Sequence, residues 1–162
     1  MNAAHFHLLI NHFPVIGGIL ATIIILSGIV LKNETVKRTA YCVFIVAAIT
    51  AVFTFLSGEG AEEIVEKISG INENLIENHE EKAAFALWTN IIVGVLSAIG
   101  LYLSFKSSKL SGVFSFVVLL VSFITIYFSW QAGNTGGKIR HPEIDNTQII
   151  QDTNTGEEQE QD

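Results

Sequence analysis

Four long apolar runs constrain the fold of this chain more than any other feature. They cover residues 8–31, 39–57, 83–105 and 110–130, and the last three contain no charged residue. A hydrocarbon core about 30 Å thick is crossed by roughly 20 helical residues, close to the length of each run. Only helices or closed barrels satisfy the backbone in lipid, and the runs lack the period-two alternation of barrel strands. The sequence therefore predicts an all-α integral membrane protein, a four-helix bundle surrounded by membrane lipid.

The charges between the runs predict the orientation of the bundle. Basic residues in the short connections are Lys32, Lys37 and Arg38 after the first run, and Lys106 and Lys109 after the third. The positive-inside rule places both connections in the cytoplasm. The long connection 58–82 holds eight glutamates and two lysines, as expected on the outer side. No Lys or Arg precedes Lys32, so we expect a translocated N-terminus rather than a signal peptide. The predicted topology is N-out/C-out.

Shorter segments complete the predicted organisation of a helical domain over 1–144. Residues 61–68 carry apolar side chains on one helical face and glutamates on the other, which predicts a short amphipathic interfacial helix. Pro14 predicts that the first helix begins or kinks there. The third helix is expected to start near Asn72 or Asn74, ahead of its apolar run. Glycines in 133–137 predict a turn after the fourth helix, and 145–162 is expected to form a disordered acidic tail.

All histidines of the chain fall on the predicted outer face. They are His5, His7 and His12 around the start of the first helix, His79 at the start of the third, and His141 after the fourth. Neutral imidazole is a ligand for Zn, Cu and haem iron. The sharpest hypothesis is a b-type haem held by His12 and by His79 or His141. A second hypothesis is a Cu or Zn site that uses three or four of the imidazoles.

The third apolar run carries a stripe of small residues below one of these histidines. At steps of three and four residues it reads His79, Ala83, Ala86, Asn90, Gly94 and Ser97. Small residues at this spacing favour close helix packing in membranes. The same stripe also leaves room for a flat cofactor beneath a histidine ligand. We expect Asn90 to donate an interhelical hydrogen bond rather than to bind a ligand.

Several segments resemble an uncharacterised family of bacterial four-helix membrane domains. The first is His7-Leu-Leu-Ile-Asn-His12-Phe-Pro14 followed by Ile16-Gly17, in which a His-Phe-Pro element opens the first helix. The segments 58–63, 79–81 and 135–141 look like those of a Bacteroidetes-type branch, and the resemblance spans roughly residues 5 to 144. It implies a domain of the bacterial cytoplasmic (inner) membrane. Relatives fused to c-type cytochrome modules imply electron transfer at the outer face, with a periplasmic c-type cytochrome or another redox partner.

The alternative function is a non-catalytic membrane subunit for interaction or assembly, with structural histidines. Such a subunit would bind its partner through the acidic outer connection and tail. The sequence contains no nucleophile elbow, phosphate-binding glycine loop or His-Glu-x-x-His motif, so a stand-alone enzyme is not expected. A formal net charge of −7 argues against nucleic-acid binding. The leading hypothesis is therefore a small membrane-integral subunit that binds haem b or a transition metal.

Overall fold

The computed structural model describes residues 3–65 and 73–140, and all regular structure in these ranges is helical. The helices are α1 (Ala3–Ile10), α2 (His12–Val30), α3 (Glu34–Val65), α4 (Glu73–Phe105) and α5 (Ser111–Arg140). Four helical stretches are long and apolar enough to cross a membrane: Ala4–Val30, Glu34–Glu62, Glu73–Phe105 and Ser111–Ile139. The predicted all-helical, membrane-type architecture is confirmed.

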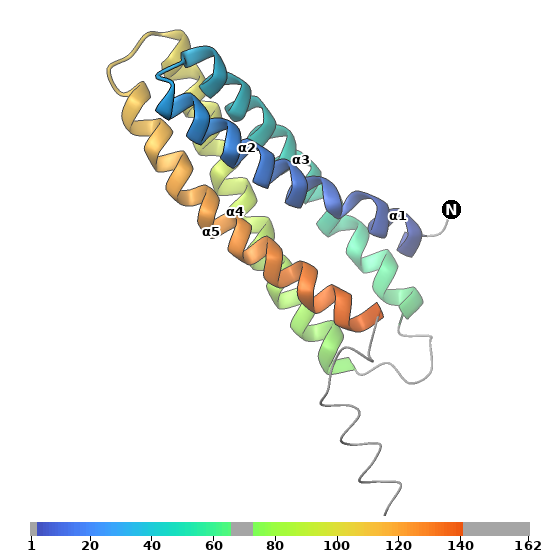
Figure 1. Cartoon of the computed structure of the whole chain (residues 1–162). Coiled ribbons are helices and arrows are strands. Elements are labelled where there is room, and N and C mark those ends of the chain that lie inside the picture. The colour runs from blue at the N-terminus through green and yellow to red at the C-terminus, as the bar shows by residue number, and fades with distance from the viewer. Residues whose placement is uncertain (1–2, 66–72, 141–162) are drawn as a thin grey trace, which may run out of the picture.

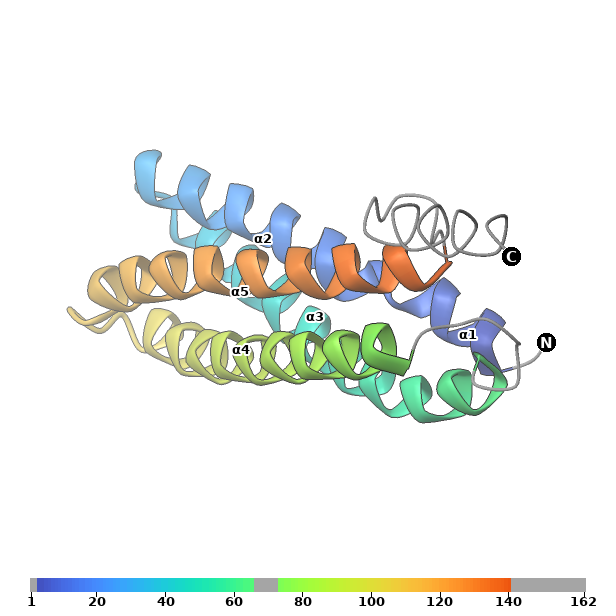
Figure 2. The same cartoon turned by 90° about the horizontal axis from the view of Figure 1, so that it is seen from below.

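The helices form an antiparallel four-helix bundle in which α1 and α2 together supply the first member (Figure 1). α3 packs on α2 and α4, α5 packs on α4 and closes the ring against α2, and α1 packs on α3. Figure 2 shows α5 between α2 and α4, so α2 and α4 lie diagonally opposite each other in the bundle. One end, here called the loop end, holds the connections 31–33 and 106–110. The opposite end, called the histidine end, holds α1, the last turns of α3 and α5, and the first turns of α4.

Large apolar side chains lie outside the bundle, and small or hydroxylated ones lie inside. Phe13 and Leu120, for example, are 60% and 65% exposed, whereas Ser97, Ser115 and Ser122 are fully buried. This distribution suits lipid as the solvent, because small interior residues let helices approach closely and apolar residues face the acyl chains. Ile25, Tyr41, Phe44, Val93 and Val118 are the large residues of the buried hydrophobic cluster.

The break between α1 and α2 follows from Pro14. Proline has no N–H to donate to the carbonyl four residues earlier, which leaves the Ile10 oxygen without its helical partner. The Thr54 hydroxyl on α3 donates to that oxygen at 3.3 Å. The helical assignment is interrupted at Asn11, although its N–H still donates to the His7 oxygen at 3.0 Å. The predicted kink is therefore present, three residues before the proline.

Three segments differ from the sequence-based boundaries or lie outside the description. α3 runs through Gly58 and Gly60 to Val65, so the described part of 61–68 continues α3 and is not a separate helix. The turn predicted at 133–137 is wrong, because α5 remains helical to Arg140. Packing against α4 offsets the low helix propensity of these glycines, about 1 kcal/mol each. α4 is described from Glu73, and its predicted start near Asn72 or Asn74 falls at the edge of the described residues. The predicted tail, 145–162, lies outside the described residues.

Candidate histidine site

His7 points from α1 toward α3, and two oxygen atoms hold its ring. Its Nδ1 lies 3.1 Å from the Thr54 carbonyl oxygen and 2.9 Å from Ser57 Oγ. The Ser57 hydroxyl already donates its hydrogen to the Thr54 carbonyl at 2.7 Å. Both neighbours therefore act as acceptors, and Nδ1 must carry the hydrogen. In the neutral ring this tautomer leaves the lone pair on Nε2, the nitrogen that would bind a metal.

His79 is held in the same way by α5. Its Nδ1 lies 3.1 Å from Thr135 Oγ1. The Thr135 hydroxyl donates within its own helix, to the carbonyl oxygens of Gln131 at 3.1 Å and Ala132 at 3.0 Å. Thr135 is thus the acceptor and His79 Nδ1 the donor, which again leaves the lone pair on Nε2. The two histidines reach the same ligand tautomer through unrelated partners.

Glycines make room for both rings. A Cβ added to Gly136 would lie 3.0 Å from Cε1 of His79 and 3.3 Å from its Nδ1. A Cβ on Gly58 would lie 3.8 Å from Cε1 of His7, an ordinary contact. At Gly136 a side chain would have to push the His79 ring aside, whereas Gly58 tolerates alanine. This explains why glycine occurs inside α5 despite its cost to the helix.

His7 and His79 lie at the same end of the bundle, on α1 and α4, and are here called the histidine pair. Thr54 and Ser57 of α3 hold the His7 ring, and Thr135 of α5 holds the His79 ring. Each ring leaves an Nε2 lone pair, and haem iron takes imidazole nitrogens of this kind as ligands.

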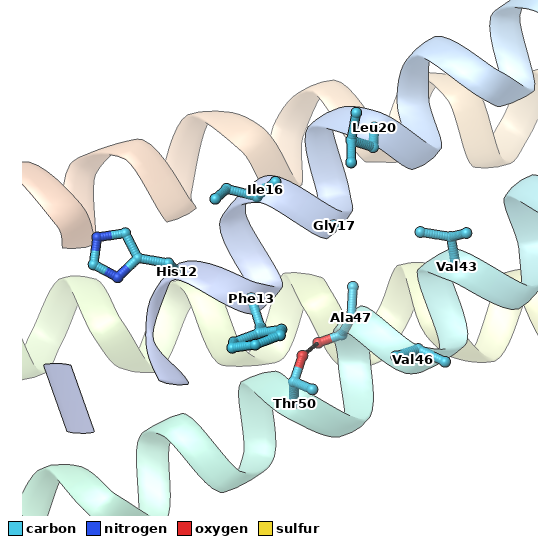
Figure 3. A pocket seen from close by; sticks show the side chains of 9 residues that line it. All are labelled: His12, Phe13, Ile16, Gly17, Leu20, Val43, Val46, Ala47 and Thr50. Carbon is cyan, nitrogen blue, oxygen red and sulfur yellow. Dashed lines mark hydrogen bonds between the residues drawn. The ribbon is translucent and has the colours of Figure 1, made fainter. Parts of the chain in front are cut away.

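The described hydrogen bond of His12 is not with His79. His12 is exposed on α2, and its Nδ1 is 3.1 Å from the Leu8 carbonyl oxygen. It stands at one end of an apolar groove of about 290 Å³ between α2 and α3, and Leu20 and Val43 lie at the other end (Figure 3). The pairing of His12 with His79 stays a prediction.

The remaining histidines do not enlarge the pair into a multi-ligand site. His5 is exposed on α1, and His141 lies outside the described residues. Within 3–65 and 73–140, no three His, Cys, Asp or Glu side chains are grouped so that they could hold a metal ion. The Cu or Zn hypothesis built on three or four imidazoles is therefore not met by the described histidines.

From the sequence, His7 is expected only among the imidazoles of a Cu or Zn site and not among the haem ligands. Asn90 behaves as predicted: its Nδ2 donates across the α4–α5 interface to Ser129 Oγ at 3.2 Å.

The fold and the site define an all-helical protein with four candidate membrane-spanning helices and a histidine pair at one end. Comparison of the chain with protein-family models, curated proteins and solved structures gave no match.

Proposed function

We propose that this protein is a small membrane-integral electron-transfer subunit that binds b-type haem through His7 and His79. The observation that carries the proposal is the shared tautomer: each Nδ1 donates to an oxygen that can only accept, which reserves Nε2 for iron. Histidine ligands of metals commonly donate their second ring N–H to a carbonyl or other acceptor, which orients the ring and raises its basicity. His141 remains a reserve ligand.

A haem at this position would serve electron exchange without covalent attachment. Two axial imidazoles give low-spin iron that keeps its ligands in both oxidation states, and the porphyrin edge can pass electrons to a partner. The protein supplies the orientation of each imidazole through Thr54, Ser57 and Thr135. An electron donor or acceptor that docks at the histidine end would be near the group.

We further propose that the histidine end faces the outside of a bacterial cytoplasmic membrane. The loop end carries Lys32, Lys106 and Lys109, and the positive-inside rule favours the cytoplasm for such connections. The histidine end carries the described glutamates of the acidic connection, in the last turns of α3 and the first turns of α4. This orientation would present the site to a periplasmic partner such as a c-type cytochrome.

An absorption spectrum of the protein purified in mild detergent from haem-replete cells tests the proposed cofactor. We expect a Soret band and, after reduction with dithionite, sharp α and β bands of bis-imidazole iron. No haem bands after haem supplementation would contradict the proposal. Metal analysis of the same sample would then separate a Cu or Zn protein from a subunit whose histidines are structural.

A further inference from the structure

A column of buried polar side chains runs through the bundle from the loop end toward the histidine pair. α5 contributes Ser111, Ser115, Ser122, Thr125 and Ser129, α4 contributes Asn90, Ser97 and Ser104, and α3 contributes Tyr41. None of these residues is more than 6% exposed. The three helices run side by side (Figure 2), so their polar side chains can follow one another across the membrane.

At the loop end the column begins in an ionic cluster centred on Glu34. Its carboxylate accepts hydrogen bonds from Ser104 Oγ at 2.8 Å and Ser111 Oγ at 3.1 Å, and pairs with Lys37 Nζ at 2.8 Å. Arg38 donates to both the hydroxyl and the carbonyl of Ser104, at 2.9 and 2.8 Å. Glu34 is exposed, so the cluster joins water at this end to the buried hydroxyls.

Toward the other end, the polar side chains of α4 and α5 lie in register. Ser104 is level with Ser111 through Glu34, and Thr125 Oγ1 donates to the Thr89 oxygen at 3.2 Å. In this antiparallel register, Ser97 of α4 lies level with the part of α5 between Ser115 and Ser122, where α5 has no buried polar side chain of its own. Neighbouring levels are thereby separated by about one helical turn, roughly 5–6 Å, which a single water molecule can bridge. Beyond Ser129 the next step is longer, about 9 Å along α5 to Thr135, whose hydroxyl lies 3.1 Å from His79 Nδ1.

Three polar atoms in the column have no hydrogen-bond partner among the described residues. They are Tyr41 Oη, Ser97 Oγ and Asn90 Oδ1, and their side chains are 0%, 0% and 2% exposed. Tyr41 Oη nevertheless lies beside the Ser115 hydroxyl, whose own hydrogen goes to the Ser111 carbonyl at 2.8 Å, so Ser115 Oγ can accept the Tyr41 hydrogen. Buried polar atoms in native proteins are nearly always paired with protein or with ordered water. Close packing alone explains the small side chains, but it does not explain the unpaired Ser97 Oγ and Asn90 Oδ1.

We propose that this column holds a chain of internal water molecules that conducts protons between the Glu34 cluster and the histidine end. A proton enters at one end, each water or hydroxyl passes one hydrogen to the next, and one proton leaves at the other end. The transfer involves no oxidation or reduction. The titratable or charged groups facing the path are Glu34, Lys37, Arg38, Tyr41, His79 and His7. Lys37 and Arg38 place positive charge at the entrance, which disfavours the entry of hydrated metal cations. The inference does not depend on haem binding.

Proton flux into sealed liposomes tests this inference. Full-length protein is reconstituted with a pH-sensitive dye inside the vesicles, and a potassium gradient with valinomycin supplies the driving force. We expect faster acidification than in empty vesicles, and a return to the empty-vesicle rate in Ser97→Val and Asn90→Leu. Each substitution replaces a polar column group with an apolar one of similar or slightly larger size.

Thr22→Val is the matched control for these variants. Thr22 is also buried, but it lies on α2 outside the column and donates to the Gly18 carbonyl at 2.8 Å. The proton flux of the Thr22→Val variant should equal that of the wild type. If Ser97→Val does not fold, as judged by gel filtration and circular dichroism, Asn90→Leu carries the test. The inference is overturned if the wild type acidifies vesicles no faster than empty ones, if sodium passes as readily as protons, or if Thr22→Val lowers the flux equally.

Discussion

The imidazole of His79 packs on Gly136 of α5 so closely that a methyl group there would stand 3.0 Å from its Cε1. This contact fixes the distance between α4 and α5 at the histidine end and holds Nδ1 of His79 against Thr135. A glycine in the last turns of a membrane helix is thus part of the candidate site. Its neighbour Gly137 has no atom within 4 Å of a built Cβ.

Gly136→Val should displace the His79 ring and break its hydrogen bond to Thr135. Overpacking of this kind costs about 1–3 kcal/mol, so the thermal unfolding midpoint in detergent should fall. Gly137→Ala is the control, because open space and a higher helix propensity predict an unchanged or higher midpoint. If the two variants lower the unfolding midpoint equally, the His79–Gly136 contact is not the cause of the destabilisation by Gly136→Val.

Gly94 marks the closest approach of α3 and α4. A Cβ added there would lie 2.5 Å from the Cβ of Ala48, so Gly94→Ala must push the helices apart. We expect a loss of about 1–3 kcal/mol of unfolding free energy, measured by denaturation in mixed micelles. Gly18→Ala should be tolerated, since Gly18 is buried yet has no atom within 4 Å of its built Cβ. Greater destabilisation at position 18 than at 94 would contradict the packing described here.

Ser107 has a positive φ of 50° at the end of α4. Its N–H donates to the Ser104 oxygen at 3.2 Å, and the next N–H to the Leu103 oxygen at 3.1 Å, the pattern of a Schellman motif. Ser107→Gly should stabilise the protein by about 0.5–1 kcal/mol, because glycine adopts this conformation without steric cost. Ser108→Gly should not. Thermal unfolding in detergent compares the two, and a lower midpoint for Ser107→Gly would count against the assigned turn.

The charge distribution predicts where reporters will be active. A reporter inserted at Asn33 or Ser107 should be active in the cytoplasm, and one fused after Asp162 should be active outside. Alkaline phosphatase and green fluorescent protein fusions give opposite signals at each site and check one another. A cytoplasmic C-terminus would invert the proposed orientation and place the histidine end inside the cell.

The apolar runs sufficed to predict the number and type of the membrane helices, because lipid leaves the backbone few alternatives. Helix ends were harder to predict. Glycine statistics alone indicated a turn in 133–137, whereas α5 continues through it. What keeps that segment helical is a contact with His79, 57 residues away from Gly136 in the chain. The local sequence of 133–137 contains no pattern that predicts such a contact.

The choice between His7 and His12 was available in part from the sequence. Five of the six buried positions of α2, namely 14, 18, 21, 25 and 28, are spaced by three or four residues, and the same spacing extends back to the half-buried positions 11 and 7. His7 belongs to this series, and His5 and His12 lie off it. Small residues such as Gly18, Ala21 and Gly28 mark the series as the packed face, which could have placed His7 inside. How near His7 lies to His79 depends on how diagonal members of the bundle converge, and the sequence carries no direct sign of that.

The central claim, that His7 and His79 are the ligands of a b-type haem, is tested most directly by comparing reduced spectra of three variants. His7→Ala and His79→Ala should each abolish the sharp α band or convert it to a high-spin spectrum. His12→Ala should keep the wild-type spectrum, because His12 is exposed on α2 and its described hydrogen bond is to the Leu8 carbonyl. Haem content per protein and gel-filtration profiles separate ligand loss from misfolding. Loss of the bands in His12→Ala with retention in His7→Ala would contradict the account.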